Sequence, residues 1–256
     1  MQSFIKSVLF LVVSVVAVHL AYVGYIRPEA HLIIEAAREA GQTAPRAISV
    51  ILKDYEQEIC MILMFWGSFL IGGKCIGILR DRYLFQVDLL GEAEKDGKMD
   101  LTVALQALED LPENIRKAPL LQVLSTSLRR YLITDNVQDT SDTIISAVDA
   151  LGMKLESENS MIRYLIWAIP SIGFIGTVRG IGEALSQADK ALAGDIAGMT
   201  NSLGVAFNST FVALLISIFL MFLLHQLQRL QDGMVVDTQE YCESFLLKRI
   251  SEIKKP

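Results

Sequence analysis

Three hydroxyl side chains lie inside strongly apolar segments of the sequence. Thr177 belongs to the run 161–182, and Thr210 and Ser217 belong to the run 203–225. A hydroxyl can donate its proton to a backbone carbonyl and still offer a lone pair to a water molecule or a cation. These three residues are therefore candidates for an ion path. The alternative is that each hydroxyl bonds the carbonyl four residues earlier on its own helix.

Small residues accompany these hydroxyls at helical spacing. In the first of the two runs Gly173, Gly176 and Gly180 share a stripe with Thr177, and in the second Ala206 and Ala213 share one with Thr210 and Ser217. Small residues let two helix backbones approach closely in lipid, where water does not drive their association. The stripes indicate either plain helix packing or packing around a central helix or ion path.

Acidic and catalytic residues are absent from the apolar runs. Glu58 and Glu183 lie only at their edges, so a proton path would need a carboxylate from another chain. The three histidines are too few for a metal cluster, and no nucleophile, phosphate-loop or CxxC motif occurs. We expect no enzyme, no metal and no cofactor beyond a transported proton or sodium ion; a membrane-embedded enzyme is the least favoured alternative. The net charge of −6 also disfavours a nucleic-acid partner.

Two further features of the run 161–182 suggest local roles. Pro170 removes a backbone donor and predicts a kink. Arg179 lies one helical turn before Glu183, near the end of the run. This pair is a possible gate at the outer mouth, and the alternative is an arginine that simply reaches the membrane surface.

Four apolar runs of about 20 residues are each long enough to cross a bilayer: 4–26, 59–79, 161–182 and 203–225. Their number agrees with a composition of 52% hydrophobic and only 20% charged residues. The sequence thus predicts an all-α integral membrane protein, with the first run retained as a helix rather than cleaved as a leader. Most Lys and Arg residues fall outside the two short connections 27–58 and 183–202. This distribution predicts that both termini are cytoplasmic.

The hydrophilic parts divide the chain into four regions. Residues 1–79 would form two peripheral membrane helices with a short external connection, 80–160 a cytoplasmic helical domain, 161–225 a pore-lining helix pair, and 226–256 a cytoplasmic amphipathic tail. Both inner helices should extend into the cytoplasm, one of them running unbroken from Thr143 to Gly182 with residues 140–142 as its cap. In the second region four basic side chains are possible contacts for a cytoplasmic partner, or simply part of a solvated surface: Arg116, Lys117, Arg129 and Arg130.

The segment IPSIGFIGTVRGIGEAL, residues 169–185, resembles the third-span motif of the MotA/TolQ/ExbB family of ion-channel subunits. In that motif a proline precedes a G-x-x-GT-V-x-GI core. The fourth span is similar to the family's A-x-x-x-T-x-x-x-L pattern at Ala206, Thr210 and Leu214. Four spans with a large loop after the second resemble MotA, and the fourth span also resembles ZorA, an antiphage member. The position of the last-span Glu of ExbB is occupied here by Val205.

The resemblance implies a homopentamer whose third and fourth helices line a central lumen. Two copies of a single-span partner similar to MotB, TolR or ExbD would place a membrane aspartate there, close to Thr177 and Thr210. Flow of protons or sodium ions would then drive mechanical, rotary work in the bacterial inner membrane. The competing hypothesis is a non-conducting four-span scaffold, for which the small-residue stripes serve packing alone.

Overall fold

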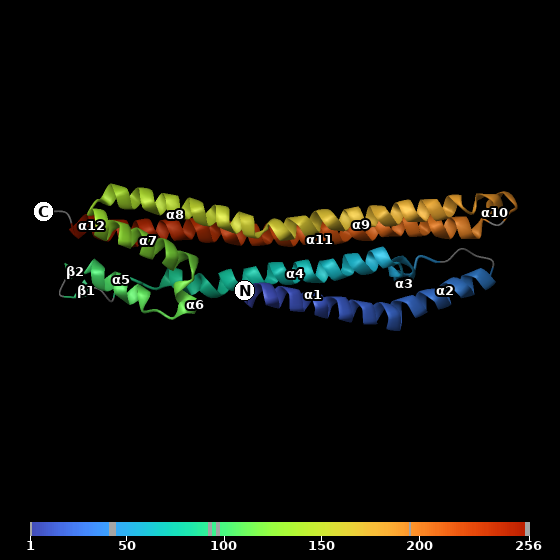
Figure 1. Cartoon of the computed structure of the whole chain (residues 1–256), viewed down its shortest axis with the longest axis horizontal. Helices are drawn as coiled ribbons and strands as arrows, with labels where there is room; N and C mark the ends of the chain where they lie inside the picture. The colour runs from blue at the N-terminus through green and yellow to red at the C-terminus, as the bar shows by residue number, and fades with distance from the viewer. Residues whose placement is uncertain (1, 41–44, 92–93, 96–97, 195, 254–256) are drawn as a thin grey trace. The chain divides into compact units, whose positions relative to one another are not determined.

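The structure is a computed structural model that describes residues 2–40, 45–91, 94–95, 98–194 and 196–253, most of them in helices (Figure 1). Two compact units divide the chain. Unit 1 comprises Met1–Gly72 and Met161–His225, and unit 2 comprises Gly73–Ser160 and Gln226–Pro256. Each unit therefore combines segments that are far apart in the sequence.

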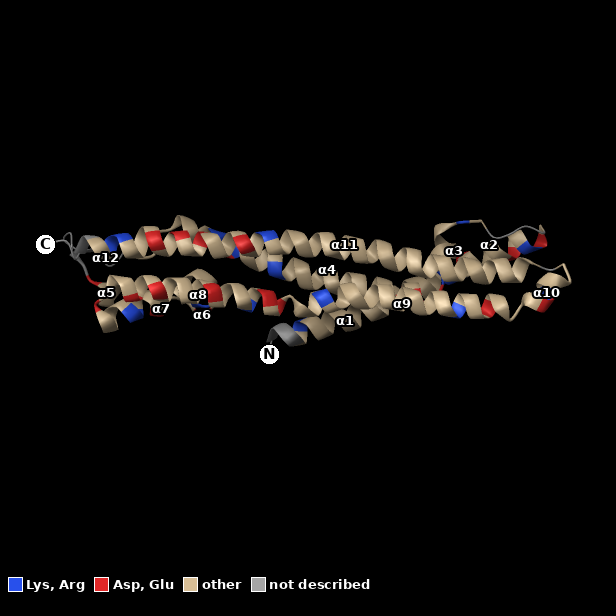
Figure 2. Cartoon of the chain, turned by 90° about the horizontal axis from the view of Figure 1, so that it is seen from above, with Lys and Arg blue, Asp and Glu red and all other residues tan. Residues whose placement is uncertain are grey.

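Unit 1 contains the longest apolar helices. In chain order its elements are α1 (Gln2–Ala21), the π-helical turn η1 (Tyr22–Ile26), α2 (Arg27–Glu39), α3 (Ile48–Leu52), the first two thirds of α4 (Tyr55–Asp81), α9 (Ser160–Leu185), α10 (Ala188–Leu192) and the first part of α11 (Ala197–Tyr241). Helices α9 and α11 lie side by side in Figure 1. Figure 2 shows long stretches without charged residues on α1, α4, α9 and α11.

Four helical segments are long and apolar enough to cross a membrane, which confirms the predicted number. They are Ile5–Glu39, Tyr55–Gln86, Val137–Leu185 and Ala197–Ser251. The second of these helices begins four residues before the apolar run 59–79. Helix α4 begins at Tyr55, so that Glu56 and Glu58, which the sequence placed at or before the edge of an apolar run, lie inside the helix and are buried.

Unit 2 is built around a leucine-rich core. Its elements are the end of α4, the 3₁₀ turn η2 (Arg82–Gln86), β1 (Glu94–Lys95), β2 (Lys98–Met99), α5 (Leu101–Glu109), α6 (Glu113–Arg116), α7 (Pro119–Thr134), α8 (Val137–Glu158), the end of α11, the π-helical segment η4 (Cys242–Leu247) and α12 (Lys248–Ile253). The two short strands pair antiparallel, with Glu94 opposite Met99. The core gathers side chains from α5, α7, α8 and η4, including Leu108, Leu121, Leu124, Leu128, Ile144 and Leu246.

The helix predicted from Thr143 to Gly182 lies within the helical segment Val137–Leu185, but it starts earlier than predicted and is interrupted at one residue. Helix α8 begins at Val137, because the Asn136 side chain accepts a hydrogen bond from the Gln138 N–H at 2.9 Å and caps it. A turn at Asn159 then separates α8 from α9. The predicted continuation of the last span is confirmed, since α11 is one helix of 45 residues.

Candidate functional site

Helices α9 and α11 pack backbone against backbone within unit 1. A Cβ atom added at Gly180 would lie 2.6 Å from the Ala206 nitrogen and 2.7 Å from the Ser202 carbonyl oxygen. Added at Gly173, it would lie 2.5 Å from the Ala213 Cβ. No side chain fits at these distances, so glycine is required for the approach.

The two faces of this helix pair differ in side-chain size and in exposure. The glycines at 173, 176 and 180 are buried, as are Ala206 and Ala213. The bulky residues face outward: Phe174 is 64% exposed and Phe207 is 70% exposed. The small stripes therefore form the contact within one chain, and the bulky stripes are left for lipid or for other chains.

Thr177 and Thr210 meet across the α9–α11 contact, where both are half-buried. The Thr177 hydroxyl donates to the Ala206 carbonyl at 3.0 Å, and the Thr210 hydroxyl donates to the Gly173 carbonyl at 3.2 Å. The two hydroxyl oxygens are also in direct contact with each other. Each hydroxyl has a single proton, which goes either to the carbonyl or to the other hydroxyl, and each oxygen keeps lone pairs that suit a cation or a donating water.

Ser217 is bound more deeply. Its hydroxyl donates to the Ile166 carbonyl at 2.9 Å, and the residue is buried in the same helix contact. The sequence suggested Ser217 as a third ion-path candidate beside the two threonines. In the structure its hydroxyl has a hydrogen-bond partner on α9. Pro170 lies inside α9, which continues through it.

A polar cluster that the sequence did not predict lies at the start of α4. Arg179 on α9 binds the Glu56 carboxylate with two hydrogen bonds of 2.8 and 2.9 Å, and it also bonds Glu183 at 3.0 Å. Asp54 lies 3.6 Å from the same guanidinium. The pair that the sequence suggested as a gate, Arg179 and Glu183, is thus joined by a buried acid from a second helix.

Glu58 anchors the other side of this cluster. Its carboxylate pairs with Arg27 and accepts a hydrogen bond of 2.7 Å from His19 Nδ1. The Tyr22 hydroxyl is buried and has no hydrogen-bond partner among the residues that the structure describes. The signal for this cluster was the run of three polar residues at 56–58 directly before an apolar segment. Their partners are up to 152 residues away in the sequence.

Gln57 links the cluster to the helix pair. Its side chain is fully buried, and its amide donates to the Ser209 hydroxyl on α11 at 3.3 Å. Ser209 in turn donates to the Val205 carbonyl at 2.9 Å. The start of α4 is therefore tied to α9 through Arg179 and to α11 through Gln57.

The basic residues proposed as cytoplasmic contacts lie on the surface of unit 2. Arg116 donates to the Glu109 carbonyl at 3.0 Å, and Arg129 pairs with the Glu109 carboxylate at 2.6 Å. Lys117 pairs with Glu113 and holds the pKa of that carboxyl below its ordinary value. Arg130 lies 3.9 Å from Asp139. All four are exposed or partly exposed and already have acidic or carbonyl neighbours, as a solvated surface would.

Comparison with known proteins gives one match. Residues 115–240 match the family model described as the MotA/TolQ/ExbB proton channel family. The matched segment contains both threonines, the three glycines and the whole α9–α11 contact. No curated protein and no solved structure matches the chain. Among the described residues, no group of three or more His, Cys, Asp or Glu side chains is placed to hold a metal ion.

Proposed function

Because the chain belongs to the MotA/TolQ/ExbB proton channel family through its segment 115–240, we propose that it is the channel-forming subunit of an ion-driven membrane motor. With a single-span partner of the MotB, TolR or ExbD type, it converts the proton or sodium motive force into rotary work. The observation that carries the proposal is the contact between Thr177 and Thr210, two hydroxyls paired at one level of the membrane-capable helices.

The two acidic residues of α4 in unit 1 support the proposal that the moving ion needs a carboxylate from a partner. Glu56 and Glu58 are the acids inside the described part of α4 in this unit, and arginines neutralise both. A carboxylate that binds and releases the travelling ion must be free to change its charge. The partner's membrane aspartate supplies it, next to the threonine pair.

The assembly that fits this reaction is a homopentamer in the bacterial inner membrane, with two copies of the partner in its lumen. Helices α9 and α11 line that lumen, with an ion path along Thr177 and Thr210 towards Ser217. Both termini and the helical region 80–160 are cytoplasmic. Arg116, Lys117, Arg129 and Arg130 would then face cytoplasmic partners.

A non-conducting scaffold is the second candidate, and one observation favours it. Each of the hydroxyls of Thr177, Thr210 and Ser217 donates to a carbonyl on the facing helix, which satisfies it without any ion. For a scaffold these bonds would be the hydroxyls' whole role. The two functions therefore differ in what happens when a hydroxyl is removed but the shape is kept.

Thr177→Val and Thr210→Val, assayed with the partner in vesicles, separate the two functions. We expect each to lower ion flux and ion-driven activity by roughly 10- to 100-fold, because an ion loses an oxygen ligand in its path. Thr200→Val is the matched control, since Thr200 is exposed and its hydroxyl donates to the Ile196 carbonyl, one residue before its own helix begins. Full flux and activity in both variants, with assembly intact, would leave the scaffold as the better description.

The chain by itself should not conduct. Vesicles that contain only this protein are expected to hold an imposed proton or sodium gradient, and adding the partner should dissipate it. Flux without the partner would mean that Glu56 or Glu58 can carry ions despite its arginine neighbour.

A further inference from the structure

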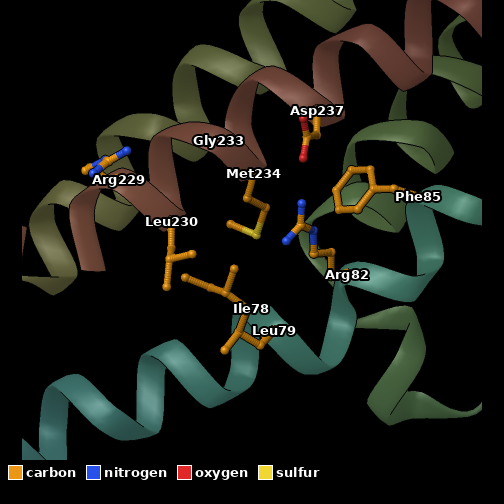
Figure 3. A pocket seen from close by; sticks show the side chains of 9 residues that line it. All are labelled: Ile78, Leu79, Arg82, Phe85, Arg229, Leu230, Gly233, Met234 and Asp237. Carbon is orange, nitrogen blue, oxygen red and sulfur yellow. The ribbon is translucent and has the colours of Figure 1, made fainter. Parts of the chain in front are cut away.

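Unit 2 contains a pocket between the end of α4, with the turn η2 that follows it, and the last part of α11 (Figure 3). Its volume is about 190 Å³. Its walls combine apolar and charged side chains: Ile78, Leu79, Arg82, Phe85, Arg229, Leu230, Gly233, Met234 and Asp237. The floor is apolar and the charged residues are all exposed, so the pocket is amphipathic.

The two arginine side chains of the pocket have no acidic partner in the described part of the chain. In the part of the chain that the structure describes, neither Arg82 nor Arg229 forms an ion pair or a side-chain hydrogen bond. In Figure 3 the Arg82 guanidinium points into the space between Met234, Phe85 and Asp237. With one carboxylate against two guanidiniums, the pocket keeps a net positive charge that one phosphodiester would balance.

The sequence places the pocket at the depth of a membrane surface. The apolar run of α4 ends at Leu79, and that of α11 ends at His225. The pocket is lined by the last two residues of the first run and by the first turns that follow both runs. Arginines at this depth attract lipid phosphates, whereas apolar walls beside them suit an acyl chain.

We propose that this pocket binds a phospholipid of the surrounding membrane. One acyl chain lies against Ile78, Leu230 and Met234, and the phosphodiester is held by Arg82, with Arg229 at the edge. A free phosphate would use the arginines and leave the apolar floor in water, so the combination of walls favours a lipid. The site is separate from the threonine pair and does not depend on ion conduction.

Gly233→Leu tests the acyl part of the site. A Cβ atom at Gly233 meets no other atom within 4 Å, so leucine fits on the helix, favours it over glycine and fills the pocket. Gly152→Leu is the matched control, an equally open helical glycine in the same unit that does not line this pocket. The full chain is extracted from vesicles of phosphatidylglycerol and phosphatidylcholine, and the lipid retained per chain is measured by native mass spectrometry.

We expect the wild type and Gly152→Leu to retain phospholipid, and Gly233→Leu to retain at least about tenfold less. Equal retention in Gly233→Leu would overturn the proposal, because the filled pocket could not then be the binding site. Failure of the wild type to retain any lipid, with the pocket protected from hydrogen exchange only when chains associate, would also overturn it in favour of a covering second copy.

Arg82→Gln tests the phosphate part, with Arg80→Gln as its control. Arg80 lies two residues before Arg82, bonds Asp81 at 3.0 Å and does not line the pocket. Arg82→Gln should weaken retention about fivefold, Arg229→Gln by less, and Arg80→Gln not at all. Inorganic phosphate should not displace the lipid. Complete displacement by phosphate alone, together with normal phosphate binding in Gly233→Leu, would show a simple anion site and overturn the lipid assignment.

Discussion

Two helix contacts in this protein are built on opposite principles. In unit 1, α9 and α11 meet through glycine, alanine and serine, and hydroxyls bond across the contact. In unit 2, α7 and α8 meet through leucine and isoleucine side chains that are almost completely buried. Water drives the second kind of contact, because apolar surface leaves it. In lipid that drive is missing, and close backbone approach takes its place. The α9–α11 contact should therefore be disrupted when a glycine is replaced by a larger residue, and the α7–α8 contact when a buried leucine is replaced by a smaller one.

Adding volume to the α9–α11 contact should have the largest effect. Gly180→Leu would place side-chain atoms where the Ala206 backbone lies, so we expect loss of the packed helix pair, above about 5 kcal/mol. Gly182→Leu adds the same side chain two residues later, where no atom lies within 4 Å, and should leave the pair intact. Hydrogen exchange of α9 and α11 in detergent measures both. Equal protection in the two variants would mean that the backbones do not approach as closely as described.

Shortening a buried side chain in the core of unit 2 should have the second-largest effect on stability. Leu124 is fully buried, so Leu124→Ala is expected to lower the free energy of unfolding by about 3 kcal/mol. Leu132, on the same helix but 39% exposed, is the control and should lose well under half of that when changed to alanine. Denaturant unfolding of the full chain, followed by exchange at α7 amides, provides the measurement. A larger loss at Leu132 would contradict the assignment of the core.

The charge cluster at the start of α4 should give an intermediate effect. Arg179→Ala leaves the buried Glu56 carboxylate without its main partner, at a cost of about 1–3 kcal/mol. We also expect the assembled channel to leak ions at rest, because the tie between α4 and α9 is lost. Glu183→Gln removes only the exposed arm of the cluster and should change stability by less than about 0.5 kcal/mol without a leak. A tight, fully active Arg179→Ala channel would reduce this residue to one that reaches the membrane surface.

The smallest effect on the free energy of unfolding is expected from the ion pair of Asp88 and Arg249 at the surface of unit 2. Arg249 hydrogen-bonds Asp88, at 2.9 Å for one of the two contacts, and holds the pKa of that carboxyl below its ordinary value of 3.8. The stabilisation is therefore fully present above pH 3.8 and is lost as the pH falls through the lowered pKa of the folded state. Because the pair is partly exposed, Asp88→Asn should cost no more than about 1 kcal/mol at pH 7. Unfolding curves of the two proteins should converge in acid; a difference that grows in acid would contradict this assignment.

The sequence was sufficient for features that depend on local pattern. Four membrane-capable helices followed from hydropathy, and the helical periodicity separated the buried Gly173 and Gly180 from the exposed Phe174. The family motif could be recognised for the same reason, since its residues are close together in the chain. Helix ends were harder to predict, because Asn136 caps α8 four residues before Thr140, the first of the cap residues that the sequence suggested at 140–142.

The long-range polar contacts could not be predicted. Hydropathy starts the second apolar run only at Ile59, because it treats Glu56 and Glu58 as residues that must face water. In the structure each carboxylate is buried beside an arginine from another helix, which removes that requirement. Which arginine pairs with which acid depends on how the helices pack, and no spacing within the sequence contains that information.

A buried pair of amides gives the helices of unit 2 a single allowed alignment. The Asn159 amide donates to the Gln231 side-chain oxygen at 2.6 Å, and both residues are almost completely buried. If α11 shifted along its axis by one turn, leucine or valine would stand opposite Asn159, and both amides would lose their partner in an apolar environment. Leucine side chains alone would tolerate such a shift far better, since one apolar neighbour resembles another. This pair therefore acts against sliding, and force applied to the end of α11 should move the turn at Asn159 together with it.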